Sequence, residues 1–454
     1  MTEQNTRPSA IDCSESNVGI RSKKRHSYSN SLSLKKTPSP EIDKESTTSK
    51  VAQFCNRSFN AFRNALGKKV RPGANHFKAL DPSFMQARGP KSAPLHTLRR
   101  SMSIDSTERT RCSIDRPRSA TNTPIKMPVS EGVRLEKMTA LLEQPIVDLN
   151  ALRKLAWNGI PVQLRGKVWK LLLGYMPSNA VRRDDTLVRK RNEYNETANS
   201  LFVTGNETLD ASLKHQIHID VERTHPTLKL FQQPVVRGML ERILYVWSIR
   251  HPASGYVQGI SDLTTPFLFV FLNSMNEINE DTSDIENRVS KEDLLTVEAD
   301  TYWCLSKLLD GIQDNYIQSQ PGIYRQVMKL QELTQRIDVD LINHFNAQGI
   351  EFMQFSFRWM NCLLMREFAL RHIIRMWDTY IAEGLTGVSD FHVYVCVSLL
   401  IKWSEQLQTM DFQDCIIFLQ SPPTRNWSDS EVEVLLSEAY LWKYLFSDAC
   451  AHLK

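Results

Sequence analysis

Two segments of the 454-residue chain carry side chains of the kinds that can assist phosphoryl transfer. In the first segment, Ile217, Asp220 and Arg223 follow one another at every third position of a helical pattern that Pro226 ends. An arginine held near a helix end by a carboxylate three residues earlier is a preoriented cation. Such a cation can neutralise charge on γ-phosphate oxygens, and an arginine supplied in trans accelerates the reaction roughly 10³–10⁵-fold.

The second segment presents a glutamine, Gln258, after a short loop that contains Pro252 and Gly255. The apolar stretch that follows indicates a helix, so we expect Gln258 in its first helical turn, where the backbone fixes the direction of the side chain. An amide held rigidly there can orient a water molecule. Arg223 and Gln258 together are therefore candidates for a charge stabiliser and a water positioner.

Each of these two residues, taken alone, also has a purely structural interpretation. Arg223 could form a surface salt bridge with Asp220 or Glu222, because charged helix ends are common. Gln258 could serve only as a hydrogen-bonding residue at a helix terminus. The residues alone leave these alternatives open.

The order of four motifs favours the functional interpretation. Ile217-x-x-Asp220-x-x-Arg223 and Tyr256-x-Gln258-Gly259 resemble the two finger motifs of the TBC domain, the catalytic unit of Rab GTPase-activating proteins. Residues similar to the opening motif of that family are Gly159, Pro161, Arg165 and Trp169, and residues similar to its closing motif are Arg366, Glu367, Trp377 and Asp378. The motifs cover about half of the chain. Residues 249–260 and 308–316 resemble one subgroup, the TBC-domain family member 22 proteins, and with that subgroup the resemblance extends to the C-terminus.

The resemblance implies a role for each finger. Arg223 would neutralise charge developing on the γ-phosphate, and Gln258 would orient the attacking water in place of the GTPase's own glutamine. Mg²⁺ and GTP would arrive with the partner, a Rab-family GTPase, so the chain would need no cofactor of its own. It would act as a GTPase activator and not as an enzyme with its own substrate turnover.

The resemblance also implies supporting residues around the fingers. Asp220 would hold Arg223, and Tyr256 would pack or form a hydrogen bond beneath the loop. Gly255 and Gly259 would allow the backbone to approach the partner. The chain departs from the common family pattern at Val257, where cysteine is frequent, and at Ser261, where asparagine is frequent, and we expect neither to touch a finger.

The elements that must position these residues are expected to be helices. Apolar residues from Leu135 to Leu142 recur at helical intervals until Pro145, and Asp148 is a candidate N-cap for a second helix that ends near Gly159. Beyond this point helical apolar stripes alternate with Pro, Gly and Asn, while strand-like alternation is scarce. We therefore predict an all-α fold, with an acidic solvated loop over residues 276–293.

Charge and composition divide the chain into four parts. Residues 1–130 hold 24 Lys and Arg against 10 Asp and Glu, a net charge of +14, which leaves −9 for residues 131–454. We expect a disordered basic tail over residues 1–132, lead-in helices over 133–158, a TBC domain over 159–386 and C-terminal helices packed on it over 387–454. The negative folded part argues against a nucleic-acid-binding protein.

The tail contains two weak signals of regulation. Apolar and basic residues over 54–69 would permit a short amphipathic helix that folds on contact, although an incidental apolar cluster is as good an interpretation. Basic residues precede four serines, which are candidate phosphorylation sites and could recruit a phosphoserine-reading adaptor: Ser101, Ser103, Ser113 and Ser119. The remaining alternatives for the tail are a solvated linker and a peripheral membrane contact.

Other chemistry lacks its sequence pattern. Gly159 and Gly166 are too far apart for a nucleotide-binding P-loop, and Val168 has no hydroxyl for Mg²⁺. No metal site is predicted. The four cysteines Cys304, Cys362, Cys396 and Cys415 are expected to be buried thiols, and Trp169, Trp303, Trp359 and Trp377 are expected to pack in the core. With no apolar run long enough to span a bilayer, we expect a cytoplasmic protein whose membrane contact would be peripheral. The family resemblance implies action in vesicle trafficking, on Golgi or other endomembranes.

A second function remains open. The fold could bind a Rab or another partner as a non-catalytic scaffold, while a phosphorylated tail recruits adaptors. The sequence does not identify the Rab, the organelle or the oligomeric state.

Overall fold

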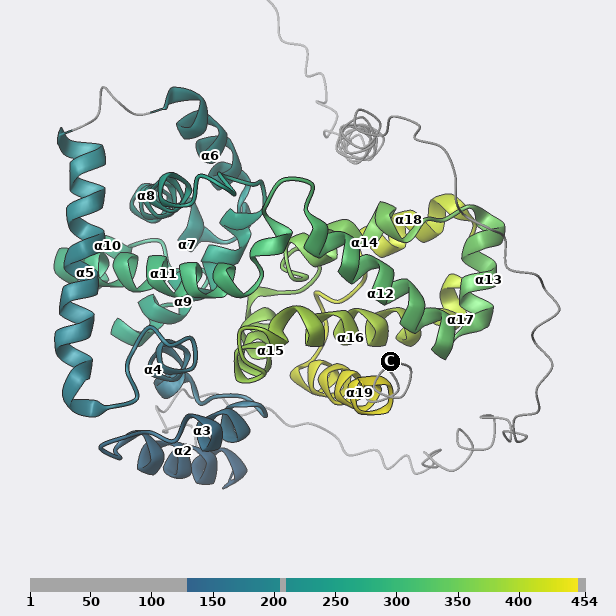
Figure 1. The fold of residues 1–454 in the computed structure, drawn as a ribbon, viewed down its shortest axis with the longest axis horizontal. Coiled ribbons are helices and arrows are strands. Elements are labelled where there is room, and N and C mark those ends of the chain that lie inside the picture. The colour runs from purple at the N-terminus through teal and green to yellow at the C-terminus, as the bar shows by residue number, and fades with distance from the viewer. Residues whose placement is uncertain (1–128, 205–209, 448–454) are drawn as a thin grey trace, which may run out of the picture. The chain divides into compact units, whose positions relative to one another are not determined.

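The computed structural model describes residues 129–204 and 210–447, and regular structure within these ranges is helical (Figure 1). The only β-type pairing among them is an isolated antiparallel bridge between Ile146 and Asn179. The prediction of an all-α fold is confirmed. Residues 1–128 of the predicted tail, with the four candidate serines and the segment 54–69, lie outside the described residues, whereas residues 129–132 are helical and not part of a disordered tail.

The helices before and immediately after the finger segments make up the amino-terminal part of the described chain. They are α2 (Val129–Leu142), α3 (Leu149–Ala156), α4 (Val162–Leu172), the 3-10 helix η3 (Ala180–Arg182), α5 (Arg183–Asn199), the π-helix η4 (Ser200–Thr204), α6 (Ala211–Arg223), α7 (Lys229–Gln232), α8 (Pro234–Arg250), α9 (Ile260–Met275), α10 (Ile285–Arg288) and α11 (Lys291–Gly311).

The remaining helices belong to the carboxy-terminal part. They are the 3-10 helix η6 (Gln313–Asn315), α12 (Pro321–Ile337), α13 (Val339–Gln348), α14 (Phe352–Asn361), α15 (Leu370–Ala382), α16 (Gly387–Lys402), α17 (Ser404–Leu407), α18 (Phe412–Gln420) and α19 (Asp429–Ser447).

Local sequence explains several helix boundaries. Asp148 caps α3, because its side chain accepts hydrogen bonds from the backbone N–H groups of Asn150 and Ala151, as predicted. Asp210 caps α6 in the same way. The helix α2 begins at Val129, ahead of the predicted residue 133, and α3 ends at Ala156 rather than near Gly159.

Two buried helices organise the core. In α9, every side chain from residue 260 to 272 is buried except Phe269, and in α16 residues 391–400 are all buried. Helices α4, α8 and α11 pack around α9, whereas α12, α15 and α19 pack around α16. Figure 1 shows these two groups, with α15 between them, and α15 contacts both α9 and α16. The finger segments belong to the group around α9.

The acidic stretch between α9 and α11 is not the fully solvated loop that the sequence predicts. It contains the short helix α10, and Ile278, Ile285 and Val289 are buried. The side chain of Gln233, the N-cap of α8, holds the segment against that helix: it donates to the carbonyl of Thr282 at 2.8 Å and accepts from the N–H of Ile285 at 3.0 Å. These apolar residues, spaced between the charges, anchor the segment to the core.

The predictions for cysteine and tryptophan hold in most cases. Cys304, Cys362, Cys396 and Cys415 are free and buried. Three tryptophans, Trp169, Trp359 and Trp377, are buried in the core, while Trp303 is only partly buried and lies beneath the ammonium group of Lys190. Of the described helices, none is long and apolar enough to cross a membrane.

Candidate functional site

Arg223 is the last residue of α6, as the position of Pro226 predicts. Its Nε atom donates to the carbonyl of Ile219 at 3.1 Å, one turn earlier in the same helix, so the side chain is tied to the backbone of α6. The side chain is 53% exposed, and among the described residues its charged partner is Asp220, at 3.7 Å from Nη2. The backbone therefore fixes the base of this cation and leaves its tip largely facing solvent.

Asp220 lies one turn before Arg223 and is buried. Its Oδ2 atom accepts three hydrogen bonds from the second segment: from the hydroxyl of Tyr256, from the N–H of Gly259 at 3.2 Å and from the hydroxyl of Ser261 at 3.0 Å. Burial and the nearby Asp220 raise the pKa of Tyr256, so its hydroxyl stays protonated and donates. Asp220 thus joins the arginine helix to the glutamine loop.

This geometry adds detail to the expected roles of Asp220 and Ser261. The closer partners of Asp220 are in the glutamine loop, and its contact with Arg223 is the longer one, so holding the arginine is not its main interaction. Ser261 makes no hydrogen bond with Arg223 or Gln258 among the described residues, in line with the expectation. Its hydroxyl nevertheless donates to Asp220 at 3.0 Å and accepts from the hydroxyl of Thr224 at 3.0 Å. Ser261 is therefore part of the connection between the two segments.

Gln258 lies in the turn before α9, and the prediction that it belongs to the first helical turn is wrong. The helix begins at Ile260, and its N-cap Gly259 has a φ of 103°, a left-handed conformation that interrupts helical geometry ahead of it. The Gln258 side chain is partly exposed, and its amide has no hydrogen-bond partner within residues 129–204 and 210–447. A free terminal amide on a fixed backbone is what a water positioner requires.

The backbone of Gln258 has a contact that the sequence did not indicate. Asn361, the last residue of α14, donates from Nδ2 to the Gln258 carbonyl at 3.0 Å. A polar residue at the buried end of an apolar helix was the available signal, since such a residue needs a partner.

The opening and closing motifs meet at one buried carboxylate. Asp378 of α15 accepts hydrogen bonds from the N–H of Ile160 at 2.9 Å, from Arg165 Nε at 3.1 Å and from Trp169 Nε1 at 2.8 Å. Burial raises the pKa of Asp378 above its ordinary value, even though the Arg165 ion pair opposes this shift. Trp377 packs beside Trp169, at 6.1 Å between ring centroids. These motif residues fasten α4 to α15.

The neighbouring glycine and proline of the opening motif shape the start of α4. Gly159 has a φ of 93°, and a Cβ atom there would lie 3.0 Å from Nε of Arg375. Pro161 is the N-cap of α4. The sequence prediction grouped these residues with the motif, and the structure places them in the α4 to α15 junction rather than beside Arg223.

Arg366 and Glu367 of the closing motif form ion pairs in different regions of the fold. Arg366 forms an ion pair with Asp262 in the first turn of α9, at 2.8 Å, with 36% of its side chain exposed. The charge of Asp262 raises the pKa of Arg366. Glu367 is buried and pairs with Arg358 at 2.6 Å. Arg366 therefore adds a second cation close to the glutamine loop, while Glu367 is internal.

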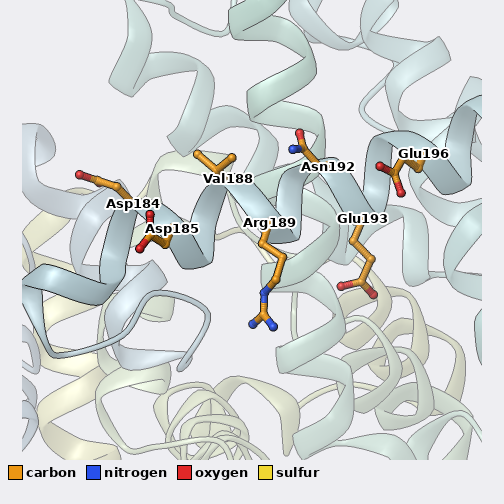
Figure 2. A pocket seen from close by; sticks show the side chains of 7 residues that line it. All are labelled: Asp184, Asp185, Val188, Arg189, Asn192, Glu193 and Glu196. Atoms are coloured by element: carbon orange, nitrogen blue, oxygen red, sulfur yellow. The ribbon is translucent and has the colours of Figure 1, made fainter.

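A surface depression elsewhere carries none of these residues. Its lining comes entirely from α5, and Figure 2 shows the side chains projecting along that one helix: Asp184, Asp185, Val188, Arg189, Asn192, Glu193 and Glu196. Exposed side chains of a single helix do not enclose a ligand. The finger segments remain the best candidate site.

Comparison with known proteins identifies the class. Residues 162–408 match the family model of the Rab-GTPase-TBC domain, which is more than half of the chain. The chain belongs to this family, as its motifs predicted.

Particular relatives agree with this assignment. The chain is 59% identical over 326 residues to the GTPase-activating protein gyp1 of Schizosaccharomyces pombe, a match that covers 71% of this chain and 63% of that protein. It is 50% identical over 329 residues to TBC1 domain family member 22B of Homo sapiens, covering 72% of this chain and 65% of that protein. The matched region thus spans slightly less than two thirds of the length of these relatives.

A solved structure shares the fold. The crystal structure of the Ypt/Rab-GAP domain of Gyp1p aligns with a TM-score of 0.66 and 48% identity, over 70% of this chain and 99% of that chain. The family match also extends past residue 386, the predicted end of the TBC domain, and includes all of α16.

Proposed function

We propose that this protein is a GTPase-activating protein for a Rab-family small GTPase, to which it supplies Arg223 and Gln258 in trans. The observation that carries the proposal is the shared carboxylate of Asp220, which ties the helix ending in an exposed arginine to the loop presenting a free glutamine amide. Relatives named as GTPase-activating proteins and a solved Ypt/Rab-GAP domain support it.

In this mechanism the chain contributes charge and orientation. The exposed guanidinium of Arg223 would approach the γ-phosphate and neutralise the charge that develops on its oxygens during transfer. The amide of Gln258 would bind the attacking water and align it with the bond that breaks. The Asp220 network joins the backbone segments that carry both groups before the partner arrives, which would reduce the ordering entropy lost in the complex.

The partner would bring the rest of the site. GTP and Mg²⁺ would be bound by the GTPase, and this chain would hold no cofactor of its own. The basic tail, net charge +14 over residues 1–130, would supply location through peripheral contact with an anionic endomembrane such as the Golgi, in vesicle trafficking. Phosphorylation of its serines would weaken that contact or recruit an adaptor.

Single-turnover GTP hydrolysis across a panel of purified Rab proteins tests the proposal. The full-length protein should accelerate hydrolysis by at least one Rab, and Arg223→Ala should remove most of the acceleration. Arg223→Lys should be nearly as slow, because lysine keeps the charge but loses the planar fork that serves two oxygens. Circular dichroism should show the same helix content in all three proteins.

The same assay separates the activator from the scaffold. A scaffold would bind a GTP-loaded Rab and leave its hydrolysis rate unchanged, in wild-type protein and in the Arg223 variants alike. Full activity of Arg223→Lys on every responsive Rab would also contradict the role assigned to Arg223.

A further inference from the structure

The peptide group that follows Gln258 is held at both of its polar atoms. Its carbonyl oxygen, from Gln258, accepts from Asn361 Nδ2 at 3.0 Å, and its N–H, from Gly259, donates to Asp220 Oδ2 at 3.2 Å. The two partners come from α14 and α6, which are far apart in the sequence. A peptide group is planar, so fixing both atoms fixes the orientation of the whole plane.

The close fit of Gly259 against Asn361 strengthens this constraint. A Cβ atom at Gly259 would lie 2.6 Å from Asn361 Nδ2 and 2.9 Å from Cys362 Sγ, so the absence of a side chain lets the amide reach the backbone. The φ of 103° at Gly259 is also one that glycine adopts readily. The loop and the end of α14 are shaped to meet at this point.

Asn361 is itself held in place. It is buried at the end of α14, and its own carbonyl accepts a hydrogen bond from the hydroxyl of Tyr316 at 2.7 Å. Burial raises the pKa of Tyr316 well above its ordinary value, so that the hydroxyl remains a donor. The amide that contacts Gln258 therefore extends from a fixed backbone.

From this geometry we propose that Asn361 is a positioning residue for the glutamine finger. The inference rests on the proposed function and extends it. Rotation of the peptide plane after Gln258 would turn the Cα–Cβ bond of that residue and move its terminal amide. Misplacement of a reacting group by about 1 Å can cost roughly 10²-fold in rate. Asn361 acts through the backbone and does not touch the nucleotide or the water.

A double-mutant cycle with Gln258→Ala and Asn361→Ala tests the proposal. In single-turnover assays on a responsive Rab, Asn361→Ala should lower the maximal hydrolysis rate about tenfold or more, while the concentration of activator at half-maximal rate changes less than threefold. In the Gln258→Ala background the same substitution should change the rate less than twofold, because there is no amide left to misplace.

Tyr316→Phe is the matched control. It removes a buried hydrogen bond to the backbone of Asn361 but leaves the contact between the Asn361 amide and Gln258 in place. The thermal midpoint should fall for Tyr316→Phe and for Asn361→Ala, and the maximal rate should fall less for Tyr316→Phe, because the amide that binds the Gln258 carbonyl is still present although its backbone has lost one restraint. Asn361→Asp, which replaces the donor by an acceptor of the same size, should be at least as slow as Asn361→Ala.

The possible results are distinct. Equal losses from Asn361→Ala in both backgrounds would overturn the inference, because the residue would then act through general stability. A slow Gln258→Ala protein beside a fully active Asn361→Ala protein would overturn the inference alone. A fully active Gln258→Ala protein would overturn both this inference and the proposed role of Gln258.

Discussion

At the scale of single residues, the site depends on one carboxylate with more partners than its sequence motif suggests. Asp220 accepts from Tyr256, Gly259 and Ser261, and its second oxygen faces Arg223 at 3.7 Å. A carboxylate that receives several hydrogen bonds can orient a loop without being at the reacting centre. The motif spacing shows only the contact along the helix, since the other partners are joined by tertiary structure.

Substitutions of Asp220 distinguish its contacts. Asp220→Asn keeps one acceptor oxygen for the loop but loses the charge that faces Arg223, so we expect stimulation of Rab GTP hydrolysis within about tenfold of wild type. Asp220→Ala leaves buried donors of the loop unpaired, at about 1–3 kcal/mol each, and should lose most of the stimulation and lower the thermal midpoint. Equal and complete loss in both variants would show that the negative charge of Asp220 opposite Arg223 matters more than its hydrogen bonds to the loop.

Two glycines of the loop offer a matched pair. Gly259 has a φ of 103° and its Cβ position lies 2.6 Å from Asn361, while Gly255 has a φ of 63° and nothing within 4 Å. Both alanine variants carry backbone strain of about 1–2 kcal/mol, but only Gly259→Ala also displaces the amide of Asn361. We expect a responsive Rab to hydrolyse GTP at least tenfold more slowly with Gly259→Ala than with Gly255→Ala. Similar rates would argue that conformation alone, and not the contact, requires glycine.

At the scale of helices, some family motifs carry the two finger residues, and others hold helices together. Arg165 and Trp169 of the opening motif bind Asp378 of the closing motif, which joins the start of α4 to α15 and makes no contact with the finger loop among the described residues. The carboxylate is buried and its donors come from both the backbone and side chains. Its role is therefore to stabilise the fold that carries the site.

Loss of the Asp378 contacts should lower the stability of the fold more than it lowers the rate of GTP hydrolysis. Asp378→Ala leaves Arg165 and Trp169 without their buried acceptor, and removal of one partner from a buried ion pair typically costs about 3–5 kcal/mol. We expect a lower urea midpoint and a lower yield of folded protein. The hydrolysis rate per folded molecule, with folded protein measured by near-ultraviolet circular dichroism, should remain within about threefold of wild type. A folded but inactive variant would place Asp378 in the finger site.

A buried histidine between α14, α15 and α16 makes stability depend on pH. His392 bonds through Nδ1 to the hydroxyl of Tyr380 at 3.0 Å and through Nε2 to the carbonyl of Trp359 at 2.9 Å. Burial lowers its pKa from 6.5 to about 4. Since the unfolded chain takes up this proton first as the pH falls, the contribution is present above about pH 6.5 and is lost towards pH 4.

Urea unfolding at two pH values measures this effect. Between pH 7 and pH 5, His392 should reduce the free energy of unfolding by about 2 kcal/mol. The variant His392→Gln keeps a donor and an acceptor but does not titrate, so it should lose less stability than wild type over the same interval. If the difference in unfolding free energy between wild type and His392→Gln were the same at pH 7 and pH 5, His392 would not be the source of the pH dependence.

The sequence predicted the elements better than the contacts between them. Asp148 predicts the start of α3 because an N-cap bonds to backbone groups only two or three residues away. The burial of Cys396 and Trp359 follows from the helical spacing of apolar residues. The start of α9 was misplaced because the φ of Gly259 depends on the approach of α14, which no local pattern encodes. Asn361 was missed for the same reason, since its partner lies about a hundred residues earlier in the chain.

At the scale of the whole molecule, charge separates the finger site from the tail. Residues 1–130 carry +14, and the rest of the chain, which holds Arg223 and Gln258, carries −9. No candidate catalytic residue lies in the tail, so the proposed chemistry and the proposed attraction to anionic surfaces fall in different parts of the sequence. Under the proposed function, this division would allow location to be regulated without altering the hydrolysis step.

Removal of residues 1–128 should therefore separate the two properties. In solution, the shortened protein should stimulate a responsive Rab within about twofold of the full-length rate, because both fingers remain. On vesicles containing phosphatidylserine, sedimentation should recover much less of the shortened protein, since each basic residue near an anionic surface adds on the order of 1 kcal/mol and the effect falls with salt. Phosphomimetic glutamate at Ser101, Ser103, Ser113 and Ser119 should weaken vesicle binding of the full-length protein in the same direction. Loss of hydrolysis in the shortened protein, on a Rab that responds to the full chain, would show instead that the tail contributes to the catalytic complex.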